Sequence, residues 1–261
     1  MKLIDGTVVE HRNRGPDYRE LVFLVPEIAS EANPGQFIHL KVPRLSNAAL
    51  RRPFSIYKVS GDGLLSIIYK RVGRGTEALG YVFKDERVSL LGPLGNGFPM
   101  PATETFPALA GGGYGIAPLV FLAKRSGRCG SAFIGAATAD DVLCSKELEA
   151  MGWEVRVATE DGSNGRKGLV TDVFDEWAGS LPERSVPEIY ACGPDGMLKA
   201  MGSRACNNGW KAWLSLDRHM GCGLGACLAC VQKIRLSDGS EVLRRVCKDG
   251  PVFEAGEVVW D

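Results

Sequence analysis

Residues 220–231 read Met-Gly-Cys-Gly-Leu-Gly-Ala-Cys-Leu-Ala-Cys-Val, and a further cysteine follows in Val-Cys-Lys-Asp-Gly-Pro, residues 246–251. Cys222, Cys227, Cys230 and Cys247 therefore have the spacing C-x4-C-x2-C-x16-C. The glycines between the first cysteines let the backbone curl around a compact inorganic core and point its N–H groups at sulfides. The segment is predicted to fold around an iron–sulfur cluster, with Cys247 as the fourth ligand.

The spacing of the cysteines also distinguishes between the possible kinds of metal site. An x4, x2 spacing is that of plant-type 2Fe-2S ferredoxins, whereas bacterial two-cluster sites have x2, x2, x3 and a following proline. Four cysteines also hold structural zinc, although zinc ribbons favour two separate C-x2-C units. The sequence predicts a 2Fe-2S cluster, and zinc and uncomplexed or disulfide-bonded cysteines stay as alternatives.

Composition indicates a redox protein of a reducing compartment. Eight cysteines, four of them at metal spacing, are not the pattern of a small disulfide-stapled secreted domain. We expect the scattered Cys129, Cys144 and Cys206 to be small buried apolar side chains. An acidic residue at position 5 argues against a signal peptide, and the longest apolar stretch, 115–123, is too short to span a bilayer. Balanced charge, 31 basic and 31 acidic residues, argues against nucleic acid. A cytoplasmic location without membrane insertion is expected.

Turn signals divide the chain into three predicted parts. In residues 1–101, apolar runs bounded by Pro and Gly predict a small antiparallel β-barrel, with strands at 20–25, 36–42 and 64–70. Residues 217–261 hold the cysteine loop and a hairpin, because runs at 233–236 and 241–243 flank Ser-Asp-Gly-Ser.

Residues 102–216 have a different pattern, in which strands alternate with helices. This alternation predicts a doubly wound parallel sheet covered by helices. The expected strands are 107–110, 131–135, 153–159, 188–191 and 211–216, and the expected helices are 117–125, 146–151, 170–177 and 195–207.

Two segments of the first part suit a nucleotide. In Arg-Arg-Pro-Phe-Ser, residues 51–55, Pro53 fixes the backbone, Arg52 offers a forked donor for a pyrophosphate, and Ser55 offers a hydroxyl for a flavin ring. Alone, the segment also fits a solvated arginine at a strand edge. The basic, glycine-containing residues 68–76 allow backbone amides to approach phosphates. Together the two segments predict a nucleotide site.

A second nucleotide site is predicted in the middle part. Residues 108–119, Ala-Leu-Ala-Gly-Gly-Gly-Tyr-Gly-Ile-Ala-Pro-Leu, run from a strand through a glycine turn into a helix, which suits phosphate, although such a turn is often only a loop. Ligands of a doubly wound sheet bind at the carboxyl ends of strands, so Cys192 in residues 190–197 should face the same crevice. The turns at 161–163 and 165–168 should border it.

These motifs together carry a family resemblance. Arg52-Pro53-Phe54-Ser55 resembles the flavin signature of the ferredoxin reductase superfamily, and the segments beginning at Gly111 and Cys192 resemble its nicotinamide signatures. With the cysteine segments, nearly the whole chain resembles the electron transfer subunits of type B dihydroorotate dehydrogenase. Tyr114 departs from the smaller aliphatic residue common there, which leaves nucleotide affinity open.

The resemblance implies the cofactors FAD, NAD and a 2Fe-2S cluster. FAD is expected in the barrel, at Arg52, Pro53, Phe54, Ser55, Ile68, Tyr69, Lys70, Gly75 and Thr76. NAD is expected in the middle part, at Gly111, Gly112, Gly113, Gly115, Asp161, Cys192, Gly193 and Pro194. Ser55 near the reacting edge of the flavin and Cys192 beside the nicotinamide are the expected catalytic residues.

The resemblance also implies a partner and a direction of electron flow. The partner is an FMN-containing catalytic subunit that oxidises dihydroorotate, in a heterotetramer of two of each subunit. Electrons would pass through the cluster and FAD to NAD+ in pyrimidine synthesis, with FAD in the middle because a flavin exchanges both hydrides and single electrons. Asp140 and Asp141 favour NAD over NADP if they face the nucleotide, and are otherwise surface carboxylates.

Two alternatives stay open. One is a related reductase that passes electrons between NAD(P)H and ferredoxin, a hydrogenase or a sulfur-reducing partner. The other is a non-catalytic redox sensor or a zinc-stabilised interaction module.

Overall fold

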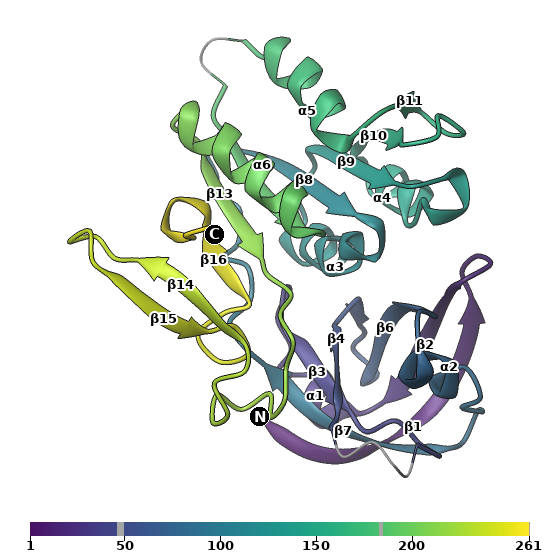
Figure 1. Ribbon diagram of the computed structural model, residues 1–261. Helices are drawn as coiled ribbons and strands as arrows, with labels where there is room; N and C mark the ends of the chain where they lie inside the picture. Colours follow the sequence, from purple (N-terminus) through teal and green to yellow (C-terminus); the bar gives the residue numbers. More distant parts are fainter. Residues whose placement is uncertain (46–49, 183–184, 261) are drawn as a thin grey trace.

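A computed structural model describes residues 1–45, 50–182 and 185–260 of the chain. Figure 1 shows a lower lobe of β-strands, an upper lobe of strands and helices, and a hairpin with a long loop beside them. Asp261, at the end of the third predicted part, lies outside the described residues. The division into three domains at the predicted boundaries stays a prediction.

The lower lobe is an antiparallel sheet that curls into a half-barrel. Its strand order is β4-β3-β7-β1-β2-β6-β5, and buried apolar side chains such as Phe23, Ile38 and Ile67 fill its inner face. The expected strands are confirmed, although β3 is shorter than predicted. The elements are β1 (Lys2–Asn13), β2 (Tyr18–Leu24), α1 (Pro26–Ala29), β3 (Phe37–Leu40), β4 (Arg52–Ser55), β5 (Lys58–Val59), β6 (Leu64–Lys70), α2 (Arg74–Leu79) and β7 (Arg87–Leu94).

The upper lobe is a mostly parallel sheet of order β11-β10-β9-β8-β12-β13-β16, covered by helices. The chain winds outward from β8 through β9 to β10, then returns to place β12 and β13 on the other side of β8, which confirms the doubly wound prediction. The elements are β8 (Phe106–Gly112), η1 (Gly113–Gly115), α3 (Ile116–Ser126), β9 (Ser131–Ala136), η2 (Ala139–Asp141), α4 (Ser145–Ala150), β10 (Glu154–Thr159), β11 (Arg166–Lys167), α5 (Val170–Gly179), β12 (Pro187–Cys192), α6 (Asp195–Asn207) and β13 (Lys211–Ser215).

Local sequence explains these elements. The central strands are apolar runs because helices cover both faces of a parallel sheet. In α5, Val170, Val173, Phe174 and Trp177 recur at helical spacing and form one buried face. That face packs on Phe133 of β9, whose ring centroid lies 5.2 Å from that of Phe174 and 5.0 Å from that of Trp177.

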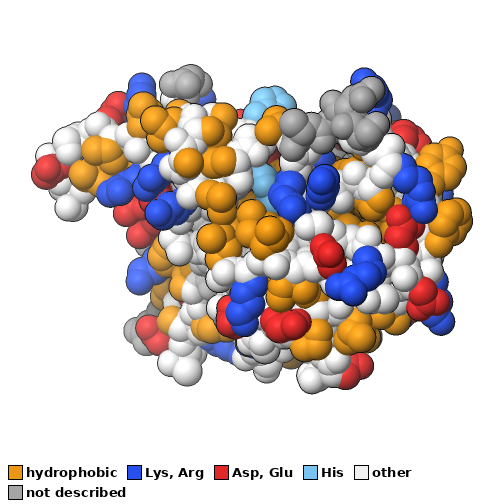
Figure 2. All heavy atoms as spheres, turned by 90° about the horizontal axis from the view of Figure 1, so that it is seen from below, with side chains coloured by type: hydrophobic (Ala, Val, Ile, Leu, Met, Phe, Trp, Pro, Cys, Tyr) orange, Lys and Arg blue, Asp and Glu red, His pale blue; other side chains and the backbone are white. Residues whose placement is uncertain are grey.

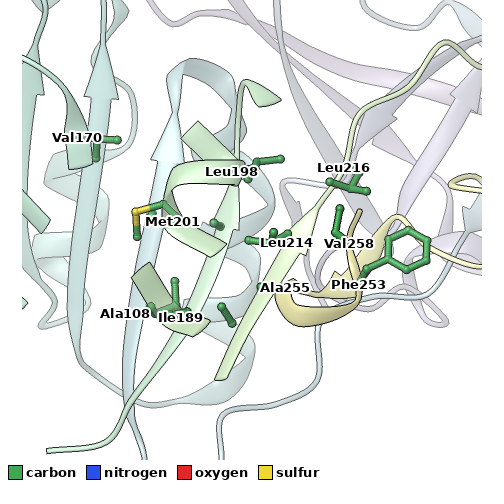
Figure 3. Packing of buried hydrophobic residues seen from close by; sticks show 14 of the residues in the cluster. Ala108, Val170, Ile189, Leu198, Met201, Leu214, Leu216, Phe253, Ala255 and Val258 are labelled. Atoms are coloured by element: carbon green, nitrogen blue, oxygen red, sulfur yellow. The ribbon is translucent and has the colours of Figure 1, made fainter. Parts of the chain in front are cut away.

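The C-terminal part is joined to both lobes. Its hairpin consists of β14 (Val231–Arg235) and β15 (Glu241–Arg245), as predicted, and it is followed by β16 (Val252–Glu254) and η3 (Ala255–Glu257). Strand β16 pairs antiparallel with β13 at the edge of the upper sheet. Figure 3 shows Phe253, Ala255 and Val258 packed beside Leu214 and Leu216, so the C-terminal part shares a core with the upper lobe.

The scattered cysteines correct one expectation. Cys129 and Cys206 are exposed and Cys144 is half-buried, so the prediction that all three are buried is wrong. Cys129 lies in the turn between α3 and β9, and Cys206 lies in the last turn of α6, where neighbouring elements do not cover it. Among the described residues, no helix has both the length and the apolar character needed to cross a membrane.

Candidate functional site

A cavity of about 1320 Å³ opens between the two lobes. It is larger than a typical pocket for one small ligand, roughly 300–1,000 Å³, and so has room for parts of two nucleotides. Most residues assigned from the sequence line it: Arg52, Pro53, Phe54, Ser55, Ile68, Tyr69, Lys70, Gly75, Thr76, Gly112, Gly113, Gly115, Cys192, Gly193 and Pro194. Gly111 and Asp161 are not among the described lining residues.

Arg51, directly before β4, and Arg52, its first residue, have different surroundings. Arg51 donates to the carbonyl oxygen of Ser89 at 2.8 Å and to its Oγ at 2.9 Å, so it fastens the start of β4 to β7. Arg52 instead lines the cavity and lies across Gly75, where a Cβ would come within 3.3 Å of its Nε. Of the pair, Arg52 is the one placed to meet a phosphate.

Thr76, in the first turn of α2, holds the loop before this helix. Thr76 Oγ1 accepts hydrogen bonds from the amides of Val72, at 2.9 Å, and Gly73, at 3.2 Å. It also donates to the carbonyl oxygen of Gly73 at 3.1 Å. These bonds fix the glycine-containing wall of the cavity opposite the upper lobe.

A carboxylate from the upper lobe joins the lobes at the cavity wall. Asp141 Oδ1 accepts from Lys70 Nζ at 2.7 Å and from the Tyr18 hydroxyl at 2.8 Å, and Thr138 Oγ1 donates to its Oδ2 at 3.0 Å. The bond from Lys70 is the main cause that lowers the pKa of Asp141, and Tyr18 and Thr138 add to it. Burial, followed by the Asp141 contact, raises the pKa of Tyr18 to about 12. Asp141 therefore faces the barrel, and Asp140 is the exposed member of the pair.

A second polar contact joins the lobes away from the cavity. The buried Tyr57 donates its hydroxyl to Glu147 of α4, and Lys58 forms an ion pair with the same carboxylate. Lys58 Nζ also lies 4.3 Å from the centroid of the Tyr57 ring. Cys144 Sγ donates to the Tyr57 hydroxyl at 3.7 Å. Together with the Asp141 contact, these interactions fix the relative position of the cavity walls.

The glycine turn after β8 packs directly on the turn after β12. A Cβ on Gly115 would lie 2.3 Å from the carbonyl oxygen of Cys192, and one on Gly112 would lie 2.6 Å from Cδ of Pro194. Glycine is therefore required here by close approach of the two strand ends. Burial raises the pKa of Cys192 to about 12, so its side chain is a neutral thiol at neutral pH and not a nucleophilic thiolate.

Two assigned residues lie elsewhere. Gly111 packs on Ile116, from which a Cβ would be 2.7–2.8 Å away. Asp161 is exposed and accepts hydrogen bonds from the Ser163 amide and hydroxyl, at 2.9 and 2.6 Å. A role for either residue in nucleotide binding stays a prediction.

The cysteine loop, residues 220–231, lies next to the cavity, and backbone amides donate hydrogen bonds to cysteine sulfurs. Cys222 Sγ accepts from the amides of Leu224 and Ala226, each at 3.3 Å, and the Cys247 amide donates to Cys230 Sγ at 3.4 Å. Burial opposes ionisation of Cys222, but backbone amide donors outweigh it and lower its pKa. Burial and the neighbouring Cys230 raise the pKa of Cys247.

This arrangement fits a thiolate-bound cluster. Amides that point at sulfur are the donors such a cluster needs, and Cys230 and Cys247 are buried side chains from separate segments. Within the described residues, no three of His, Cys, Asp or Glu stand at metal-binding distance from a common point.

Comparison with known proteins identifies two segments and the chain as a whole. Residues 217–259 match the iron-sulfur cluster binding domain of dihydroorotate dehydrogenase B, and residues 109–202 match the oxidoreductase NAD-binding domain. The chain is 41% identical over 266 residues to the dihydroorotate dehydrogenase B (NAD(+)) electron transfer subunit of Geobacillus sp. (strain WCH70), covering 99% of each. It is 37% identical to that of Desulforamulus reducens, covering 100% of this chain and 99% of the relative.

The chain belongs to this family of electron transfer subunits. Family membership confirms the resemblance predicted from the sequence, and the match over residues 217–259 favours an iron–sulfur cluster over zinc. The NAD-binding match argues against a non-catalytic zinc module. A solved NADH-dependent reduced ferredoxin-NADP oxidoreductase, studied for flavin-based electron bifurcation, has a similar fold, with a TM-score of 0.82 and 29% identity over 98% of this chain and 90% of that chain.

Sequence reasoning missed several residues of the site. Tyr18, Phe37, Met220 and Pro251 line the cavity, yet none lies in a nucleotide motif. One signal was available for Phe37, because it alternates with His39 in β3 while Ile38 and Leu40 occupy the barrel core. That alternation marks Phe37 and His39 as residues of the opposite face.

Replacement of Asp141 by Asn should weaken the contact between the lobes. The variant keeps the shape but loses the charge that Lys70 meets, and we expect about 1 kcal/mol less stability at pH 7, since solvent partly screens the pair. The folded-state pKa of Asp141 lies below its ordinary 3.8, so this stabilisation is present above about pH 4 and is lost as the pH falls through the lowered pKa. Urea unfolding of both proteins from pH 7 to pH 3 measures the difference.

The exposed neighbour Asp140 provides the matched control. Asp140→Asn should unfold like the unchanged protein at every pH. A difference between Asp141→Asn and the unchanged protein that stays constant down to pH 3 would contradict the assignment.

Proposed function

We propose that this chain carries electrons between an FMN-containing, dihydroorotate-oxidising partner subunit and NAD+. The route runs through a 2Fe-2S cluster held by Cys222, Cys227, Cys230 and Cys247 and through FAD in the barrel. The observation that carries the proposal is the cavity itself. The Arg52–Ser55 segment, the glycine turn after β8 and the Cys192–Pro194 turn all line one space, and Met220 and Pro251 beside the cysteine segments line it too.

The residues of the chain supply binding and orientation. When bound, FAD would exchange a hydride with a nicotinamide and single electrons with a cluster. Arg52 offers paired N–H donors to its pyrophosphate, and Ser55 places a hydroxyl on the cavity wall for the flavin ring. Cys192, at the carboxyl end of β12, presents an uncharged thiol where the nicotinamide is expected.

The 2Fe-2S type follows from the ligand spacing. The x4, x2 spacing and the single additional cysteine supply four thiolates, the number that such a cluster takes. The glycine-rich loop lets amides reach Cys222 Sγ, which is what a cluster with negative charge requires.

The partner is proposed to dock on the cysteine loop. Leu224 and Leu228 are 42% and 60% exposed, and Leu228 holds a left-handed φ of 59°, a conformation that is costly for leucine and concentrated at functional sites. The loop lies below the β14–β15 hairpin in Figure 1, and Figure 2 shows hydrophobic side chains gathered among Lys and Arg on the face seen from below. A partner docked on this apolar surface would receive the electron over a short path. A heterotetramer of two of each subunit is part of the proposal.

A second candidate has support from one observation. The fold is shared with a reduced ferredoxin-NADP oxidoreductase at a TM-score of 0.82, so a related reductase that serves another redox partner is the alternative function. Purification of the chain with its native partner, followed by an assay of NAD+ reduction by dihydroorotate, decides between the two.

The cluster assignment predicts the effect of removing one thiolate. Cys227→Ser should abolish the 2Fe-2S absorption and EPR signals but leave FAD bound, because the ligand loop and the flavin wall are separate segments. Hydride exchange between NADH and FAD should persist. The exposed Cys129→Ser is the control and should keep the full signal. Iron and sulfide at full content in Cys227→Ser would show that the ligand set is wrong.

The flavin assignment predicts that Arg52 holds FAD. Arg52→Ala should weaken binding by about 1.5–3 kcal/mol, roughly 10- to 150-fold, and Arg52→Lys should recover part of this because a point charge lacks the fork. FAD retained after dialysis measures the effect. Arg87→Ala, on β7 and outside the described lining, is the control. Full FAD content in both Arg52 variants would remove this residue from the site.

The proposed docking surface predicts that one substitution can weaken assembly with the partner subunit without affecting reduction of the flavin by NADH. Leu228→Glu should weaken the complex, since it buries a charge in the interface, while NADH still reduces the flavin of the isolated chain. Val186→Glu, next to the start of β12 in the upper lobe, tests the same change at a similarly exposed site and should assemble normally. The isolated chain should reduce artificial acceptors but not oxidise dihydroorotate. An undisturbed Leu228→Glu complex, or dihydroorotate oxidation by the chain alone, would count against this arrangement.

A further inference from the structure

His39 is a buried polar side chain that the proposed route does not yet use. It is fully buried in β3, and among the described residues neither of its ring nitrogens has a hydrogen-bond partner. An unpaired buried polar group destabilises the folded state, and such groups are rare in folded proteins. A missing partner is therefore expected beside this ring.

The neighbours of His39 show where that partner belongs. A Cβ on Gly223, the residue after Cys222, would lie only 2.6 Å from His39 Nδ1 and 2.7 Å from Cε1. Gly223 also has a φ of +69°, so both space and conformation require glycine there. His39 is not among the described residues that line the cavity. Its ring therefore faces the cysteine loop and not the nucleotide space.

The same face of β3 also reaches the segment of the last cysteine. Phe37, two residues before His39, packs in one apolar cluster with Cys230 and Cys247, and it lines the cavity as well. Its ring contacts His39 edge-on at a centroid distance of 5.9 Å. Phe37 and His39 pair across the strand with Ser55 and Pro53 of the flavin segment. This face of β3 thus stands between the flavin wall and both cysteine segments.

We infer that His39 donates a ring N–H hydrogen bond to a sulfur of the cluster held by the cysteine loop and so raises the cluster's reduction potential. Imidazole carries at least one N–H in either charge state, so the donor is present at every pH. A donor to sulfur stabilises the reduced, more negative cluster over the oxidised one. His39 is then a positioning residue for electron transfer, and the inference rests on the proposed cluster.

The test is an EPR-monitored redox titration of the full-length, cluster-loaded chain. His39→Phe removes the donor but fills the space, and it should shift the ratio of reduced to oxidised cluster about tenfold toward the oxidised form, which is 59 mV for a one-electron couple. His39→Gln keeps an N–H donor and should stay near the unchanged protein. Ile38→Val, on the barrel side of the same strand, controls for disturbed packing and should leave the potential unchanged.

A second measurement tests the inference even if the His39→Phe variant fails to assemble its cluster. With ¹⁵N-labelled histidine, pulsed EPR of the reduced cluster in the otherwise unchanged protein should detect a weak nitrogen coupling. His39→Gln should lose this coupling, and replacement of the exposed His219 by Gln should keep it. A cluster signal without the coupling, or equal potentials in the unchanged and His39→Phe proteins, would overturn the inference alone. Absence of any cluster signal in the unchanged protein would instead overturn the proposed function.

Discussion

The attachment of residues 247–254 to both lobes is the constraint on which the rest of the site depends. Strand β16 extends the upper sheet through β13, while the Asn96 amide of the lower lobe donates to the Gly250 carbonyl oxygen at 2.6 Å. Cys247 is the first residue of this segment, so both lobes together set its position. As a proposed cluster ligand, Cys247 would lie at a constant distance from the cavity, which suits electron transfer over a short path.

Two polar contacts also fix the lobes to each other. Asp141 meets Lys70 and Tyr18 at the cavity wall, and Glu147 meets Tyr57 and Lys58 farther away. Neither contact is deeply buried on both sides, so each contributes modestly to stability. Their larger effect is on geometry, because they hold the lower-lobe and upper-lobe walls of the cavity in a fixed relative position. Strand β3 completes this frame, since one of its faces belongs to the barrel core and the other faces the cysteine segments.

The sequence by itself determined the fold class and the family, and most of the residues that it assigned to nucleotides line the cavity. The evidence for these conclusions is local in the sequence: alternating apolar residues, the helical spacing in residues 170–177 and the spacing of four cysteines. Such local patterns can be recognised without knowing the tertiary contacts. For the same reason Arg52, Ser55 and the glycines after β8 could be assigned from their motifs. Asp161 and Gly111 show the limit, because proximity in the sequence to a motif does not place a residue in the cavity.

Only the tertiary structure decided which residues meet across long separations. The motif assigns Arg52 to the site but says nothing of Arg51, which the structure fastens to Ser89 of another strand. Asp141 lines the cavity, but its carboxylate is bonded to Tyr18, 123 residues earlier, a pairing that no motif predicts. The burial of His39 against Gly223 joins segments more than 180 residues apart, and no local pattern encodes such a contact. The physical reason is that side-chain pairing across elements depends on how sheets pack, which spacing along the chain does not specify.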